Sequence, residues 1–238
     1  MEESQTTVEI RPIAHIRSDF ASKFGIPRQS GLAPALKAEV VFEPDFAIRE
    51  AVRGLSDFSH IWLIWGFSEN QRDSWSPTVR PPRLGGNTRM GVFATRSPFR
   101  PNGLGLSSVR LSSVEYTSHG VPILHITGAD LMDGTPVYDI KPYLITTDCH
   151  PDATTGFVHP DEFVPLQVEI PDTLSQMMTD NERESLLQIL SQDPRPAYQD
   201  QPERIYGFPF SRYEIKFFVK EDVLHVTEIL PFQKTKKQ

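Results

Sequence analysis

Proline is the feature that most limits what this chain can fold into. The chain has 238 residues and 21 of them are proline, whereas proline averages about 5% of residues in globular proteins. Proline has no backbone N–H and its ring clashes with the preceding helical turn, so it interrupts helices, while edge strands tolerate it. Helices should therefore be few and short, and we predict a mainly β fold.

Apolar patterns predict strands through the first 150 residues. Residues 60–67 form a continuous apolar run, which indicates a buried strand. Residues 106–116 and 123–127 are typical of an antiparallel pair that turns around His119-Gly120. Further strands are expected at residues 8–17, 38–42, 90–94 and 137–143, and a helix at residues 46–54.

The pattern changes in the last third of the chain. Residues 149–165 are polar and contain proline, as in a linker. Thr179 and Glu182 form a capping-box pattern, which predicts an amphipathic helix that ends before Pro194. A hairpin is expected from residues 212–219 and 223–230. We therefore predict two domains, a mainly β domain at residues 1–150 and a small α+β domain at residues 151–238.

Arginines gather between residues 72 and 110, although the net charge of the whole chain is −7. The segment contains seven arginines and no lysine, and Asp73 is its only acid. Guanidinium groups bind phosphates in a bidentate manner and stack on bases. The segment also holds Trp75 and Phe93, which should prefer to be anchored, so a braced loop fits better than disorder. We predict a surface for a polyanion such as RNA; the alternative is a solubilising face paired with acids elsewhere.

Several standard sites are absent from the sequence. There is no GxxxxGK[ST] phosphate loop, and Gly103 and Gly105 form a lone GxG without a third glycine. The seven histidines show no metal-binding spacing, and Cys149 is the single cysteine, which excludes a disulfide within the chain and a zinc site built on cysteines. No apolar run reaches the roughly 18 residues of a membrane span, and no signal peptide is evident. We expect a cytoplasmic protein that uses neither a metal nor a membrane.

Polar turns follow several of the expected strands. Turns at strand ends are common places for ligand pockets. Each turn taken alone is better explained by ordinary turn chemistry, and the pattern does not show whether the turns meet in space. These segments are Pro27–Gln29, Ser68–Asn70, Thr95–Ser97, Asp133–Pro136 and Asp139–Tyr143.

Long blocks of sequence around these turns resemble the TsaA-like (TrmO) family of tRNA methyltransferases. The resemblance covers about residues 8–145, and residues 193–198 with the terminal strand pair resemble the small C-terminal domain of that family. One departure is visible, because Gly103 stands where the family usually has a second proline after Arg100-Pro-Asn102. The blocks are residues 24–32, 52–62, 79–87, 89–97, 100–102 and 133–143.

The resemblance implies a fold, a cofactor and a substrate. The N-terminal domain should be a single-sheet β-barrel that binds S-adenosylmethionine, and the active form should be a homodimer with the cofactor near the subunit interface. The substrate should be the anticodon loop of a tRNA with N6-threonylcarbamoyladenosine at position 37, and the product its N6-methyl derivative.

The resemblance also assigns roles to residues. Cofactor contacts are expected from Pro27, Arg28, Gln29, Ser68, Glu69, Arg96, Leu106, Asp133, Gly134, Thr135 and Pro136. We expect RNA contacts from Arg80, Arg83, Arg89 and Arg100. The catalytic residue is unknown; Asp133, Asp139 and Tyr143 are candidates for a base, but positioning of the acceptor nitrogen is favoured over a dedicated base.

Two other functions account for part of the sequence. A non-catalytic RNA-binding module explains the arginine-rich segment but not the turns at Pro27–Gln29 and Asp133–Pro136. A methyltransferase for a small anionic metabolite explains the turns as well. Binding of S-adenosylmethionine separates the first alternative from an enzyme, and methyl incorporation into tRNA separates the second.

Overall fold

Six strands in the first 142 residues close into an antiparallel barrel. The computed structural model describes residues 7–68, 74–84, 86–158, 164–195 and 204–232. The strands follow one another around the barrel in the order β1-β2-β7-β6-β3-β8, so the mainly β fold and the barrel expected from the sequence are confirmed. They are β1 (Ala14–Ser18), β2 (Lys37–Phe42), β3 (His60–Gly66), β6 (Leu104–Tyr116), β7 (Pro122–Thr127) and β8 (Pro136–Pro142).

Alternating side chains fill the interior of the barrel. In β7 the buried residues alternate with half-buried ones, and Leu124 and Ile126 are almost fully buried. In β3 the same alternation turns Ile61 and Leu63 inward. Side chains of a strand point to opposite faces in turn, so one face of each strand builds the core and the other faces outward.

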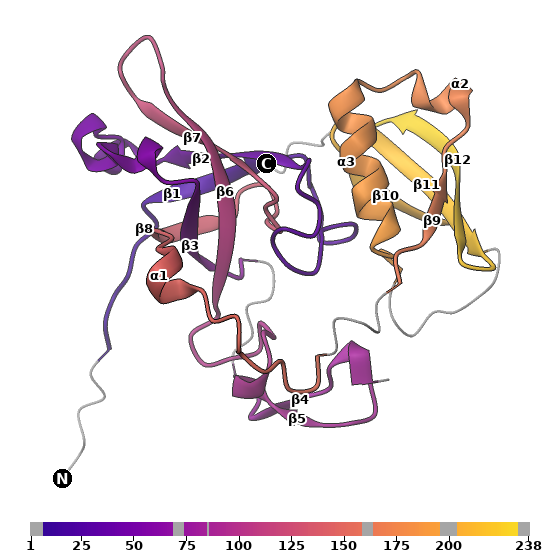
Figure 1. Cartoon of the computed structure of the whole chain (residues 1–238), viewed down its shortest axis with the longest axis horizontal. Coiled ribbons are helices and arrows are strands. Elements are labelled where there is room, and N and C mark those ends of the chain that lie inside the picture. The colour runs from indigo at the N-terminus through magenta and orange to yellow at the C-terminus, as the bar shows by residue number, and fades with distance from the viewer. Residues whose placement is uncertain (1–6, 69–73, 85, 159–163, 196–203, 233–238) are drawn as a thin grey trace.

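The pairing of the strands defines two ends of the barrel. At one end, β3 finishes at Gly66 opposite Leu104 of β6, and β1 finishes at Ser18 opposite Ala38 of β2. We call this end the mouth. At the other end, His60 pairs with Arg110, and the β6–β7 hairpin projects beyond the barrel (Figure 1). We call this the far end.

Three expectations about local structure are wrong in part. The expected helix at residues 46–54 is replaced by the 3-10 turns η1 (Pro44–Phe46), η2 (Arg49–Val52) and η3 (Leu55–Asp57). None of these turns has a side-chain cap, and Val52 is the one buried residue in them, so little holds a longer helix together. The first strand begins at Ala14, where pairing with β2 begins, and not at residue 8. The strand expected at residues 90–94 is limited to β5 (Met90–Gly91) and continues as the 3-10 turn η5 (Val92–Ala94).

A four-stranded sheet and one helix form the C-terminal module. The helix α3 (Asp180–Ser191) begins with the expected capping box, in which Thr179 and Glu182 bond each other's backbone. Its apolar face packs on the sheet, whose strand order is β10-β11-β12-β9. The hairpin of β11 and β12 was expected from the sequence, whereas the other two strands and the short helices were not. The module contains β9 (Gln167–Glu169), α2 (Asp172–Ser175), β10 (Tyr206–Phe210), β11 (Tyr213–Lys220) and β12 (Val223–Pro231), and α1 (Ile145–Asp148) precedes it.

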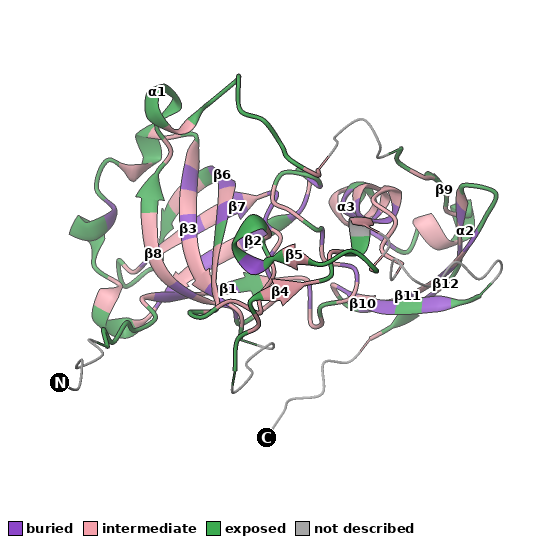
Figure 2. Cartoon of the chain, turned by 90° about the horizontal axis from the view of Figure 1, so that it is seen from below, coloured by how far each residue is buried: buried purple, intermediate pink, exposed green. Residues whose placement is uncertain are grey.

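The connection between β1 and β2 belongs to the core of the C-terminal module. Phe20 is buried against Phe210, with ring centroids 5.8 Å apart, and Phe24 meets the ring of Phe208 at 5.9 Å. The Ala35 amide donates to Oε1 of Gln188 on α3 at 2.8 Å. Figure 1 shows these dark loops between the barrel and the module, and Figure 2 shows buried segments in both bodies. The division at residue 150 stays a prediction, but residues 20–36 pack with the second core.

Candidate functional site

The arginine-rich segment is braced by its own backbone. The Ser76 amide donates to the carbonyl of Phe99 at 3.2 Å, and the Val92 amide donates to the carbonyl of Pro77 at 3.0 Å. Val92 is almost fully buried. The described part of the segment is therefore a folded loop, as expected from its apolar residues. It contains the small sheet of β4 (Thr78–Val79) and β5, and the 3-10 turn η4 (Pro82–Leu84).

Arg100 holds this loop in shape. Its guanidinium donates to the carbonyls of Thr95 and Ser97, at 3.2 Å each. The same side chain is half-buried. Arg100 therefore fixes the turn that carries Arg96.

Arg96 joins this turn to the connection between β1 and β2. Its guanidinium donates to Oε1 of Gln29, and the Gln29 amide group donates in turn to the carbonyl of Arg28 at 2.6 Å. Arg28 donates to the carbonyl of Asp193 in the C-terminal module at 3.3 Å. Two turns that the sequence singled out separately thus meet at the mouth, and Pro27 beside them is buried.

A second set of hydrogen bonds joins Asp130 to the inside of the barrel. The Trp65 indole N–H donates to the hydroxyl of Ser107 at 3.0 Å, and that hydroxyl donates to the carboxylate of Asp130 at 2.7 Å. Burial raises the pKa of the Asp130 carboxyl, while the Ser107 hydrogen bond, backbone amides and the charge of Arg96 act in the opposite direction. Asp130 and Arg96 therefore belong to one electrostatic unit, with Ser107 and Trp65 holding the carboxylate from inside.

Sequence reasoning missed Asp130 and Ser107. Ser107 stands at an inward position of β6, between the outward Leu106 and Ser108, and only 2% of it is exposed. A buried hydroxyl in a strand needs a hydrogen-bond partner. The alternation of β6 is a signal that the sequence contains, but it does not say that the partner is an aspartate after β7.

Two glycines shape the strand that starts at the mouth. Gly105 lies against the indole ring of Trp65, where an added Cβ would stand 2.3 Å from the nearest ring atom. Gly103, which stands where the resemblance predicts a proline, has a φ of +54°. Proline is limited to φ near −65°. The loop after Asn102 therefore follows a path here that the usual residue does not allow.

The Asp133–Pro136 turn is fastened to the end of β1. The Ser18 amide donates to Oδ1 of Asp133 at 3.0 Å, and the Gly134 amide donates to the carbonyl of Ile16 at 2.8 Å. The Thr135 side chain is buried and donates to a carbonyl within the turn. The turn lies at the mouth and begins three residues after Asp130.

We call Gln29, Arg96 and Asp130 the Arg96 cluster. The described contacts of the other two candidates for a base do not include this cluster. Tyr143 packs on the ring of Trp62 at the far end, with centroids 5.6 Å apart. Desolvation and the neighbouring Cys149 and Asp148 raise the pKa of the Tyr143 hydroxyl, which makes its ionised form scarcer. Asp139 forms an ion pair of 2.9 Å with Lys141, two residues along the same strand.

The remaining expected contacts are spread over the surface. Leu106 is 53% exposed on the outer face of β6, whereas Ser107 points inward, so Leu106 does not face the Arg96 cluster of its own chain. Ser68 is exposed just beyond β3, and Glu69 lies outside the described residues. Arg80 and Arg89 are exposed, and Arg89 donates to the hydroxyl of Thr78 at 3.1 Å. The side chain of Arg83 lies outside what the structure describes, as do Arg72 and Asp73.

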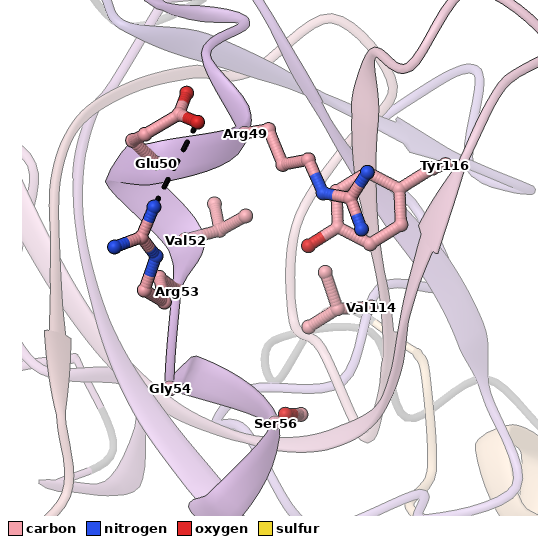
Figure 3. A pocket seen from close by; sticks show the side chains of 8 residues that line it. All are labelled: Arg49, Glu50, Val52, Arg53, Gly54, Ser56, Val114 and Tyr116. Carbon is pink, nitrogen blue, oxygen red and sulfur yellow. Dashed lines mark ion pairs between the residues drawn. The ribbon is translucent and has the colours of Figure 1, made fainter.

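A separate pocket opens at the far end, between η2, η3 and the end of β6. Its volume is about 380 Å³, and Figure 3 shows the Arg49 guanidinium over the ring of Tyr116, 4.7 Å from its centroid. Arg53 and Glu50 form an exposed pair of 3.8 Å on its rim. The predicted site residues do not line this pocket, whose lining is Arg49, Glu50, Val52, Arg53, Gly54, Ser56, Val114 and Tyr116.

The described residues give no sign of a metal site or of a membrane-spanning helix. Among the described residues, no group of three or more His, Cys, Asp or Glu side chains is placed to hold a metal ion. Within the same residues, no helix has the length and apolarity needed to cross a membrane.

Comparisons with known proteins identify the class to which this barrel and mouth belong. Residues 15–149 match the family model described as the tRNA-methyltransferase O N-terminal domain, and residues 164–232 match the TrmO C-terminal domain. The class is thus that of barrel-fold tRNA methyltransferases. The chain belongs to the tRNA-methyltransferase O (TrmO) family, as the resemblance of the sequence implied.

Individual relatives agree over nearly the whole chain. A tRNA (adenine(37)-N6)-methyltransferase of Escherichia coli (strain K12) is 42% identical over 95% of this chain and 99% of its own length. A putative S-adenosylmethionine-dependent methyltransferase, RcsF, of Pseudomonas aeruginosa is 40% identical over 94% of this chain and 98% of its own. A crystal structure of TrmO from Pseudomonas aeruginosa superposes with a TM-score of 0.76 at 34% identity, covering 94% of this chain and 99% of that one.

Proposed function

We propose that this protein is an S-adenosylmethionine-dependent tRNA methyltransferase that methylates N6 of the adenine at position 37. The observation that carries the proposal is the meeting of Gln29, Arg96 and Asp130 at the mouth of a barrel that matches the family's N-terminal domain. The E. coli relative is named for that reaction and spans nearly the same length. We further propose that the adenine carries the N6-threonylcarbamoyl group.

The chemistry of the side chains at the mouth fits the proposed methyl donor. S-adenosylmethionine carries a carboxylate and an ammonium group on its amino-acid half. A guanidinium binds a carboxylate well, and a carboxylate of raised pKa such as that of Asp130 is stabilised when a cation approaches. We assign Arg96 and Gln29 to the carboxylate and Asp130 to the ammonium. When bound, the donor supplies an electrophilic methyl group on a sulfonium.

The main task of the chain is then to place the acceptor nitrogen. The N6 lone pair is delocalised into the purine and the carbamoyl group, so accurate positioning contributes more than binding strength alone. Trp65 and Ser107 fix the Asp130 carboxylate, and Arg100 fixes the turn that carries Arg96. The contacts of Asp139 and Tyr143 support positioning over a dedicated base.

The arginines of the same segment suit the acidic part of the substrate. The threonylcarbamoyl group ends in a carboxylate, and the anticodon loop adds phosphates. Arg80 and Arg89 are exposed on the loop that also carries Arg96. We assign them to these anions, and the tRNA is modified in the cytoplasm.

We also propose that the active form is a homodimer. Leu106 lies directly across from Ile64 of β3, on the outer face of the barrel, and is 53% exposed. This outward pair of apolar residues supports a subunit contact. Such a contact would bring Leu106 of one subunit to the mouth of its partner. Sedimentation of a Leu106→Asp variant tests the contact: it should run as a monomer, and an unchanged dimer contradicts it.

The reaction is tested by methyl transfer to defined tRNAs. The protein is incubated with labelled S-adenosylmethionine and tRNA from a strain that lacks its gene, and the digested nucleosides are identified by mass spectrometry. We expect N6-methylated threonylcarbamoyladenosine, and no product with a transcript that bears plain adenine at position 37. Binding of the donor without transfer supports an RNA-binding module, and transfer to small anions alone supports a metabolite methyltransferase. Methylation of the plain transcript at the same rate refutes the threonylcarbamoyl assignment.

A further inference from the structure

Two aromatic rings stand exposed on the arginine-rich loop. Trp75 is 49% exposed and Phe93 is 73% exposed, although the sequence led us to expect both to be anchored. Their rings are nearly parallel, at 23°, with centroids 6.2 Å apart. Since a single neighbouring ring covers one side of a side chain, the exposed fraction of Phe93 leaves a ring face open to solvent.

This exposure follows from a fixed backbone. Phe93 comes directly after Val92, which is 1% exposed and whose amide bonds the carbonyl of Pro77. The Thr95 amide and hydroxyl both donate back to the carbonyl of Val92, at 3.1 and 2.8 Å. The buried valine and these bonds hold the 3-10 turn that presents the phenyl ring outward.

The surroundings of the rings are positively charged. Residues 74–110 contain six arginines and no acidic residue. Of these arginines, Arg80 and Arg89 flank the small sheet that connects the two aromatic residues, and both are exposed. Aromatic faces combined with cationic side chains are the usual means of binding unpaired bases of a single strand, because bases stack while phosphates are neutralised.

The position of the rings ties them to the mouth. Phe93 precedes Arg96 by three residues, so their Cα atoms are at most about 10 Å apart. Arg96 contacts Gln29 there. A base on the phenyl ring would therefore lie beside the base that enters the mouth.

We propose that Trp75 and Phe93 form a stacking platform for an unpaired nucleobase adjacent to the methylated adenine. This inference rests on the proposed function and adds a second base-binding site to it. RNA fits better than a second copy of the chain, because a twofold contact through this face would bring two arginine-rich loops together. A base with its phosphate satisfies both the aromatic faces and the charge.

Binding of an anticodon stem-loop to the full-length protein tests the platform. We compare Phe93→Leu and Trp75→Leu with wild type, with Phe93→Tyr as the variant that keeps a ring, and with Ile145→Ala as a control. Ile145 is 75% exposed on α1 at the far end (Figure 2). We expect each leucine variant to bind about 5- to 150-fold more weakly, the loss that corresponds to one stacked base. The tyrosine and control variants should bind like wild type.

Two further measurements separate stacking from other contacts. Leucine variants should keep the slope of log affinity against log salt, whereas Arg80→Ala and Arg89→Ala should each lower it by about one. Two stem-loops that each lack one base, at position 36 or at position 38, are also tested. The one that lacks the stacked base should bind wild type weakly, and Phe93→Leu should not lower its affinity further.

Three results would overturn the platform. The first is that both leucine variants bind the stem-loop within twofold of wild type. The second is that Phe93→Leu lowers the affinity for both abasic stem-loops by the same factor as for the intact one. The third is a leucine variant that dissociates into monomers, which assigns the rings to a subunit contact. Methylation by the wild-type protein is measured in parallel, so that a failed proposed function, with no methylation at all, is distinguished from a failed platform.

Discussion

The two ends of the barrel carry arginines and aromatic rings in different arrangements. The far end has a hollow of about 380 Å³ beside η2 and η3, and its ion pair between Glu50 and Arg53 is local and exposed. At the mouth, the Ser107 hydroxyl bonds the buried carboxylate of Asp130, the Trp65 indole bonds that hydroxyl, and the charge of Arg96 acts on the same carboxylate. We therefore place the proposed chemistry at the mouth, where buried polar groups meet, because a hollow alone does not mark a site.

The strongest way to break this comparison is to remove one arginine from each end. Arg96→Ala should lower kcat/KM for tRNA methylation by about 100-fold, because the loop then loses a preorganised cationic group at the donor site. Arg53→Ala should stay within about twofold, since exposed ion pairs contribute little. Steady-state kinetics at saturating tRNA, with the concentration of S-adenosylmethionine varied, measure kcat/KM for both variants. Equal losses at the two ends would contradict the assignment of the mouth.

Asp130→Asn sharpens the electrostatic part of the comparison. Above neutral pH it should lower kcat/KM about tenfold. This corresponds to a loss of roughly 1.4 kcal/mol of transition-state stabilisation, because the donor is oriented less well. Because burial raises the pKa of this carboxyl, wild-type activity should rise with pH as the carboxylate forms, and the variant should lack that rise. A raised folded pKa also means that wild type loses stability relative to the variant as pH increases through that pKa.

The check on Asp130 therefore has two readouts. Kinetic pH profiles should differ between the two proteins, and thermal unfolding at pH 8 should show the asparagine variant to be at least as stable as wild type. If the stability of the asparagine variant relative to wild type falls between pH 4 and pH 8, the pKa of Asp130 is lowered and not raised by folding.

Gly103→Pro tests the path of the loop at the mouth. The φ of +54° cannot be adopted by proline, so the change should cost more than about 1 kcal/mol of stability and lower activity severalfold. Gly103→Ala should cost about 1 kcal/mol, because nothing lies near the added Cβ and the penalty is in the backbone alone. Chemical denaturation measures both. If the proline variant is as stable as wild type, the loop accepts the family's usual conformation.

The smallest effect is expected at the far-end pocket. Tyr116→Leu removes the ring beneath Arg49 and should cost about 0.5 to 1 kcal/mol, the range of an exposed cation–π contact. Methyl transfer should be unchanged, because the described contacts of this pocket do not reach the mouth. A clear loss of tRNA affinity in this variant would give the far end a part in binding.

The sequence predicts the framework of the site better than its interior. Strands at His60–Gly66 and in the β6–β7 pair follow from apolar periodicity, and Arg96 with Gln29 follows from turns and the family resemblance. Asp130 could not be found in this way, because an aspartate after a strand is ordinary turn chemistry. Its role depends on Ser107. The sequence predicts that the two strands pair, but it does not show that their register, with Arg110 opposite Thr127, brings the Ser107 hydroxyl to the Asp130 carboxylate.

Aromatic residues show the same limit. Hydrophobicity led us to expect that Phe93 is anchored, yet it is 73% exposed, whereas Phe24 packs on Phe208. Phe24 is covered because Phe208, far away in the sequence, packs against it. Periodicity carries no information about such pairs, and so the link between residues 20–36 and the C-terminal module was missed.

The contact between Phe20 and Phe210 has a consequence for how the protein is made. Phe210 and Asp193 leave the ribosome after all the barrel strands, so the Pro27–Gln29 turn cannot gain its final support until the C-terminal module has been made. A chain that stops at the end of the barrel retains the barrel strands but lacks the anchor for Arg28, whose carbonyl partner belongs to Asp193. The order of synthesis thus makes the final placement of the Pro27–Gln29 turn depend on the C-terminal module.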